Sequence, residues 1–263
     1  MRDTRDMLLV LLSSLLMLTG CSRRDILDDY PVSGVEISLD WNGVTNKLPE
    51  GVRVIFYPKN AEGRKIDTYL SVKGGKVKVP PGRYSVVVYN YDTETVQIRG
   101  EEAYETIEAF TGHCNGLGIA GTEQLVWGPD LLYVVRIDDL KIENSEEELQ
   151  LNWKPKLVVK TYSFKLKVQG LEYVSSIVGS IEGMSSCYDL GLGCGKAGDS
   201  PIYFAARGSA GEVTGSFTVF GTSEGVISRA GNAIKLTLAF VKTDNKVQKM
   251  EVDITEVDGR SEE

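Results

Sequence analysis

The chain has 263 residues, of which 42% are hydrophobic and 25% charged, and this balance excludes a disordered protein. The formal net charge of −8 argues against a nucleic-acid-binding protein, because such proteins neutralise phosphates with basic side chains. His113 is the one histidine, so a metal site built from several histidines of one chain is excluded.

The first 20 residues have the pattern of a signal peptide. Arg2 and Arg5 precede Met7–Leu18, an apolar run too short to span a bilayer comfortably. The following Leu18-Thr19-Gly20-Cys21 resembles a bacterial lipobox, which implies cleavage before Cys21 and acylation of its thiol, for example by palmitate. We therefore expect a signal peptide over 1–20, an acylated tether over 21–32, and an outer-membrane lipoprotein facing the periplasm or the cell surface.

Period-two alternation of apolar and polar residues dominates the remaining chain. Val35, Ile37, Leu39 and Trp41 share one face of a predicted strand. This alternation predicts half-buried strands, and their regular spacing predicts β-sandwiches. In chain order, the further predicted strands are Val52–Tyr57, Lys65–Val72, Lys76–Val79, Tyr84–Tyr91, Thr95–Arg99, Leu132–Ile142, Tyr162–Val168, Ser175–Met184, Pro201–Arg207, Val213–Phe220, Ile234–Phe240 and Lys246–Thr255.

A charged run, Ser145–Glu148, separates two series of strands. We expect a boundary near Asn144–Lys154, with an N-terminal β-sandwich over 33–146 and a C-terminal one over 147–263. The only stretch in which a helix is possible is Glu101–Ala109, in the first half of the chain.

No pattern in the chain makes a convincing catalytic or cofactor site. Gly116–Gly121 matches G-x-G-x-x-G, but Trp127-Gly128-Pro129 soon ends any helix that would follow, so we interpret it as a glycine-rich loop. His113 and Cys114 are adjacent, which rarely places a base and a nucleophile in line. The sequence thus predicts a non-enzymatic protein without a cofactor or a metal.

Cys187 and Cys194 flank a short segment that a hairpin could close. Export would place them in an oxidising compartment, where a disulfide can form. Because the sequence does not give the distance between the two residues, a disulfide and a pair of free thiols are equally compatible with it.

Gly75–Asn90 carries the most specific pattern in the chain. A short strand is followed by Pro80-Pro81-Gly82, and Tyr84 then opens an apolar strand that ends in Tyr89-Asn90. Here the prolines end the ladder, Gly82 permits the turn and the Tyr84 ring is placed to be buried, so these four residues are interpreted as structural.

This pattern resembles that of Bacteroidales fimbrillin-like lipoproteins, which include fimbrium-anchoring and fimbrillin-associated subunits. Val52–Pro58, Trp127–Tyr133 and Lys246–Asp258 also resemble segments of that family. The resemblance implies an all-β fold of two tandem transthyretin-like (Greek-key) β-sandwich domains, fimbrillin-like subunits as partners and cell adhesion as the role. Arg23-Arg24 lies too early to release a long pro-segment, which favours an anchor or accessory subunit over a shaft subunit.

The expected mode of binding is β-strand addition to an exposed sheet edge. Gly100–Asp130, with Tyr104, Phe110, His113 and Trp127, is the predicted interaction loop, although its apolar side chains could equally cap the sandwich. A glycan- or nutrient-binding lipoprotein that uses such aromatic residues is the alternative function. The receptor stays unknown.

Overall fold

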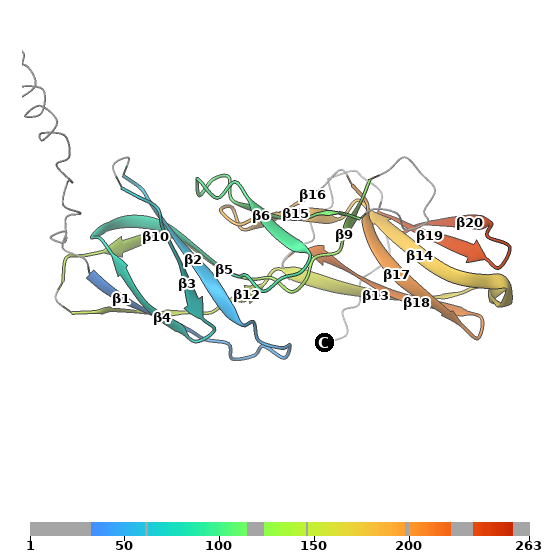
Figure 1. Cartoon of the computed structure of the whole chain (residues 1–263), viewed down its shortest axis with the longest axis horizontal. Coiled ribbons are helices and arrows are strands. Elements are labelled where there is room, and N and C mark those ends of the chain that lie inside the picture. Colours follow the sequence, from blue (N-terminus) through green and yellow to red (C-terminus); the bar gives the residue numbers. More distant parts are fainter. Residues whose placement is uncertain are drawn as a thin grey trace, which may run out of the picture. The chain divides into compact units, whose positions relative to one another are not determined.

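A computed structural model describes residues 33–60, 63–114, 124–145, 147–197, 200–221 and 234–254. The signal peptide, Cys21, the tether and Gly116–Gly121 therefore lie outside the described residues. Figure 1 shows that the described part is built from strands, coloured in chain order. Its one helical element is a 3-10 turn, η1 (Leu171–Tyr173). No helix in these residues has the length and apolar character needed to cross a membrane.

The N-terminal sheet has eight strands in the order β11-β1-β4-β3-β2-β5-β10-β12. One of its faces carries the first hydrophobic cluster, which includes Val35 and Ile37 of β1 together with Phe56 of β2. These side chains are buried because alternate residues of a strand point to the same face. The strands are β1 (Ser33–Leu39), β2 (Gly51–Pro58), β3 (Ile66–Ser71), β4 (Gly74–Val79), β5 (Gly82–Asn90), β10 (Tyr133–Ile142), β11 (Leu149–Trp153) and β12 (Lys156–Leu157).

The C-terminal sheet follows the order β13-β18-β17-β14-β19-β20. Its core includes Ile181, Ile202, Phe217 and Leu238. A two-strand hairpin from the first half of the chain, β8 with β9, joins this sheet through a parallel β9–β17 pair. The strands are β8 (His113–Cys114), β9 (Leu125–Trp127), β13 (Val159–Lys167), β14 (Val174–Glu182), β17 (Ile202–Ser209), β18 (Glu212–Phe220), β19 (Lys235–Lys242) and β20 (Val247–Asp253).

A four-stranded sheet, here called the shared sheet, takes two strands from each half of the chain. Its order is β16-β15-β7-β6, and the central pair aligns Cys187 with Phe110 and Asp189 with Glu108. Ala109 and Tyr188 from this sheet, with Ile55 of the N-terminal sheet, belong to one hydrophobic cluster. The strands are β6 (Val96–Arg99), β7 (Glu108–Thr111), β15 (Ser185–Asp189) and β16 (Cys194–Ala197).

No helix forms at Glu101–Ala109, so this expectation is wrong. Residues 101–106 form turns, in which the amide of Ala103 donates to the carbonyl of Gly100 and that of Thr106 to Ala103. Gly100 has a φ of 68°, which favours glycine. Residues 108–111 then form β7, which is held in an extended conformation by pairing with β6 on one side and β15 on the other.

Strand pairing also crosses the boundary expected between residues 146 and 147. β11 and β12, expected in the C-terminal sandwich, pair with β1 and β10 of the N-terminal sheet. The all-β class is confirmed, whereas the division into two tandem transthyretin-like domains stays a prediction.

Candidate functional site

The outer strands of the three sheets are the places where another chain could add a strand. An outer strand offers unpaired backbone N–H and C=O groups, and proteins commonly guard such edges with charged side chains. Five of the six strands that end the three sheet orders follow this rule: β6, β12, β13, β16 and β20 each carry lysine or arginine. β11, with the sequence Leu-Gln-Leu-Asn-Trp, carries no charged residue.

β11 combines this uncharged edge with an apolar inner face. It pairs in parallel with β1, from Val35 with Leu149 to Leu39 with Trp153. Trp153 is buried, and Leu149 and Leu151 pack against the first hydrophobic cluster. A strand added beside β11 would therefore gain backbone hydrogen bonds and would extend an existing apolar face.

Contacts at both ends hold β11 in place. At its start, both carboxylate oxygens of Glu148 accept hydrogen bonds of 2.8 Å from Lys76 Nζ. At its end, the Asp40 amide donates to the Trp153 carbonyl at 2.8 Å. The β11 edge is thus fixed before any partner arrives, which reduces the entropy lost on binding.

β10 is a contrasting case in the same sheet. It pairs with β12 only at Tyr133 and Val134. Among the described residues, the rest of β10 is therefore paired on one side only, with β5. The register shifts between Ile137 and Leu140, and residues 136–141 include four charged side chains. A bulge and charges are features that discourage strand addition, and they make β10 a poorer acceptor than β11.

The predicted interaction loop is not a single loop, because β7, β8 and β9 lie within Gly100–Asp130. Tyr104 donates to Asp138 at 2.7 Å, and its ring packs on Tyr57. Burial, followed by the bond to Asp138, raises the pKa of Tyr104 to about 12. The Tyr104 side chain is therefore held within the fold.

The other three residues of that prediction lie on separate strands. Phe110 is on β7, and the guanidinium carbon of Arg99 lies over its ring, 4.6 Å from the ring centroid. His113 is on β8, and Trp127 on β9 packs edge-on against Tyr203. His113 and Trp127 therefore lie on the paired strands β8 and β9, whereas Phe110 lies on β7 and Tyr104 in the turn before it.

The Pro80–Tyr84 motif is a packing feature. Tyr84 is 5% exposed and its ring meets Phe56 edge-on at 6.0 Å. Gly82 is the first residue of β5 and is not among the glycines with positive φ in the described chain. A Cβ at Gly82 would lie 3.3 Å from the Tyr84 ring, so glycine is favoured there by close approach and not by a left-handed turn.

The candidate disulfide between Cys187 and Cys194 is absent, and both residues are free thiols. Strand register explains this result, because Cys187 lies opposite Lys196 while Cys194 lies opposite Asp189. Burial raises the pKa of the Cys187 thiol, which lowers its reactivity.

A row of charges crosses the shared sheet and was missed by the sequence analysis. Lys196 Nζ lies 3.0 Å from Glu108 and 2.8 Å from Asp189, and Arg99 also binds Glu108. Burial alone would raise the pKa of Glu108, but hydrogen bonds from Lys196 and Arg99 outweigh it and leave the pKa below its usual value. No group of three metal-ligating side chains occurs among the described residues.

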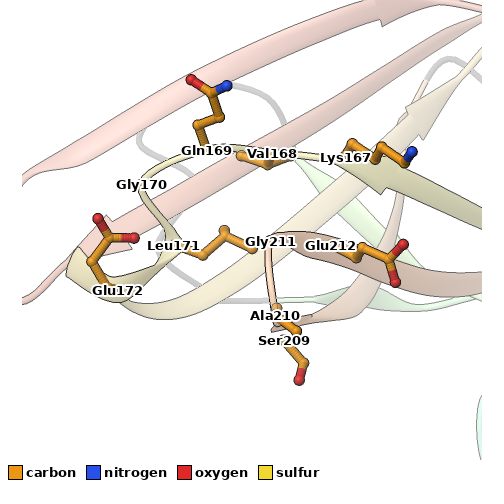
Figure 2. A pocket seen from close by; sticks show the side chains of 11 residues that line it. Lys167, Val168, Gln169, Gly170, Leu171, Glu172, Ser209, Ala210, Gly211 and Glu212 are labelled. Carbon is orange, nitrogen blue, oxygen red and sulfur yellow. The ribbon is translucent and has the colours of Figure 1, made fainter.

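A large hollow at one end of the C-terminal sheet lacks the convergent groups of a binding site. It has a volume of about 800 Å³ and lies between the turn 167–172 and the hairpin 208–212. Figure 2 shows Lys167, Glu172 and Glu212 pointing in different directions. Small-molecule sites instead place a few polar groups around a common point.

The described features define a class of protein: an all-β chain in which the outer strand β11 is uncharged and in which the described residues hold no metal-ligating cluster. A family model for a domain of unknown function, DUF5119, matches residues 20–205, and the chain belongs to this family, among the Bacteroidales fimbrillin-like adhesins.

Relatives support this assignment. The chain is 62% identical over 274 residues to the "Putative fimbrium anchoring subunit Fim4B" of Bacteroides ovatus, covering 100% of this chain and 82% of the relative. A crystal structure of a "putative adhesin" from Bacteroides ovatus matches with a TM-score of 0.82 and 60% identity, covering 91% of this chain and 88% of that one. The fimbrial anchor protein Mfa2 of Porphyromonas gingivalis shares the fold at a TM-score of 0.51 and 10% identity, over 85% of this chain and 82% of that one.

Proposed function

We propose that this protein is a non-enzymatic, lipid-anchored subunit of the outer membrane that holds a fimbria-like assembly by accepting a strand at the β11 edge. The observation that carries the proposal is that β11 carries no charged residue, whereas the five other strands that end the three sheet orders each carry lysine or arginine. The name of the Bacteroides ovatus relative supports an anchoring role. The lipobox at Leu18–Cys21 supports attachment to a membrane.

Strand addition at β11 would be governed by backbone groups and by the apolar side chains on the inner face of the strand. Leu149 and Leu151 lie on the core side, while Gln150 and Asn152 are exposed. Alternate residues of the added strand would therefore meet apolar surface, which is the usual source of register in this mode of binding.

The double variant Gln150→Lys with Asn152→Lys tests the proposal at the edge. Lysine on an outer strand opposes the approach of another strand, so cells carrying the variant should shed fimbrial material into the medium. Gln248→Lys is the matched control, because Gln248 is exposed on β20, an outer strand that already carries charges. Equal retention of fimbriae by the folded double variant and the control would disprove binding at β11.

Cys21→Ala tests the membrane anchor separately. Without the thiol no acyl chain can be attached, and the protein should move from the detergent phase to the aqueous phase. A variant that stays in the membrane fraction would contradict the lipoprotein assignment while leaving the β11 result unaffected.

A further inference from the structure

A second concave site lies on the N-terminal sheet, away from the β11 edge. Its volume is about 200 Å³, and its lining comes from β2, β3, β5, β6, the segment after β5 and Glu101 just after β6. Tyr69, Arg53 and Tyr89 are direct cross-strand neighbours on β3, β2 and β5, and therefore form one row on one face of the sheet.

Arg53 is fixed at the centre of this row. Its Nε and Nη2 donate to the two carboxylate oxygens of Asp67 at 2.9 and 2.7 Å, and Nη1 donates to the Tyr89 hydroxyl at 2.8 Å. Glu101 also binds the guanidinium. Paired planar groups of this kind have a defined geometry, so the polar floor of the site is organised in advance.

Two aromatic rings stand exposed at this site. Tyr69 is 60% exposed and Tyr91 is 45% exposed. Their ring centroids are 5.3 Å apart and their planes meet at 78°, so they form a corner. Both residues line the hollow. Single exposed apolar residues are normal on a protein surface and need no explanation. Two large exposed rings that touch each other beside a hollow form a contiguous patch, which indicates a binding surface.

We propose that this site, the Tyr69–Tyr91 site, binds a neutral pyranose sugar. One face of a pyranose is a patch of C–H groups, which can lie against the electron-rich face of a tyrosine ring. The hydroxyl groups at its edge can donate to the carboxylate of Glu101, which lines the hollow and is partly exposed. The volume is below the range of about 300–1,000 Å³ that is typical of drug-sized ligands, which favours a single sugar ring.

A cation is a poorer fit to the same surface. The Arg53 guanidinium already lies 5.6 Å from the Tyr69 ring centroid and 5.9 Å from that of Tyr89. A ligand cation would have to compete with Arg53, which the carboxylates of Asp67 and Glu101 already hold in place, for the faces of those rings. The structure therefore favours an uncharged ligand, and this inference is independent of the anchoring role.

Saturation-transfer NMR on the purified chain tests the proposal, with the methyl glycosides of glucose, galactose and mannose as free probes. Choline chloride is the cationic probe. Immobilised neutral oligosaccharides that end in the same sugars then distinguish a chain-end glycan from a free sugar. We expect transfer to at least one glycoside, none to choline, and a loss of affinity of about tenfold or more in Tyr69→Ala and in Tyr91→Ala.

Tyr173→Ala is the matched control, because Tyr173 is also a highly exposed tyrosine but lies in η1 of the other half of the chain. It should leave sugar binding unchanged, and an unchanged melting temperature shows that each variant is folded. Absence of transfer to all three glycosides, binding that survives Tyr69→Ala with Tyr91→Ala, or saturable binding of choline alone would overturn the proposal.

Discussion

The hydroxyl group of Tyr84 donates a hydrogen bond of 2.9 Å to the carbonyl oxygen of Pro80, four residues earlier in the chain. The ring of the same tyrosine is buried against Phe56. One side chain thus closes the turn before β5 and also fills part of the first hydrophobic cluster, so the two contributions can be separated by substitution.

Tyr84→Ala should lower the free energy of unfolding by about 3–5 kcal/mol, because it empties the space of a large buried aromatic ring. Tyr84→Phe keeps the ring and removes only the hydrogen bond to Pro80, so a loss of about 1 kcal/mol is expected. Denaturant unfolding measures both variants. An unchanged stability of Tyr84→Ala would mean that the ring is exposed in solution and would reopen a binding role for it.

Glu108→Gln should destabilise the protein at pH 7 by removing the carboxylate that binds Lys196 and Arg99. The pKa of Glu108 is lowered in the folded chain, so its contribution is present above the ordinary glutamate pKa and disappears as the pH falls through the lowered value. The difference in the free energy of unfolding between Glu108→Gln and the native chain should therefore shrink below about pH 4.

Denaturant unfolding at a series of pH values measures this effect. Glu105→Gln is the control, because Glu105 is an exposed residue of the neighbouring turn. A pH-independent difference between Glu108→Gln and the native chain would show that the charge of Glu108 is not what stabilises the shared sheet.

Alkylation should modify Cys114, Cys187 and Cys194 when the protein is unfolded in guanidinium without a reductant, because all three are free thiols. Mass spectrometry counts the modified sites. If the count rises only after reduction, two of the thiols are bonded in the native protein, and Cys187 of β15 does not lie opposite Lys196 of β16.

Replacing 115–123 with a short glycine-containing turn should leave the fold intact. Cys114 and Leu125 are paired on β8 and β9, so the ends to be joined lie about 5 Å apart. The replacement must spare Thr111, which is buried in β7 and paired with Val96. If this region is an interaction segment, retention of fimbriae should fall while the melting temperature is maintained. Unchanged retention by the folded variant would limit the segment to a connecting role.

Local alternation made much of the fold predictable. Val35, Ile37 and Leu39 were expected on one face and are all buried. Partners of the strands were not predictable in the same way, since nothing near Cys187 in the sequence indicates that it lies opposite Phe110. The pairing of distant strands depends on the whole chain, and for this reason the division at residue 146 did not foresee that β11 pairs with β1.

The candidate sites differ in the same respect. The uncharged composition of Leu149–Trp153 can be read from the sequence, but its position at the end of a sheet cannot. The exposure of Tyr69 could be predicted locally, because it alternates with Asp67 and Ser71 on the polar face of β3. An aromatic residue in an otherwise polar phase is a sign of an exposed ring, whereas its contact with Tyr91 depends on tertiary structure.

The shared sheet sets an order of events during synthesis. β7 emerges from the ribosome long before its neighbour β15, so one side of β7 must wait, unpaired, until residues 185–189 have been made. The hydrophobic cluster beneath it is incomplete for the same interval, because Tyr188, Leu190 and Phe220 are among its members. A chain cut within the second half would leave the first half with an exposed strand edge and a partly uncovered core. Both are features that promote aggregation, so the two halves of this protein must mature together.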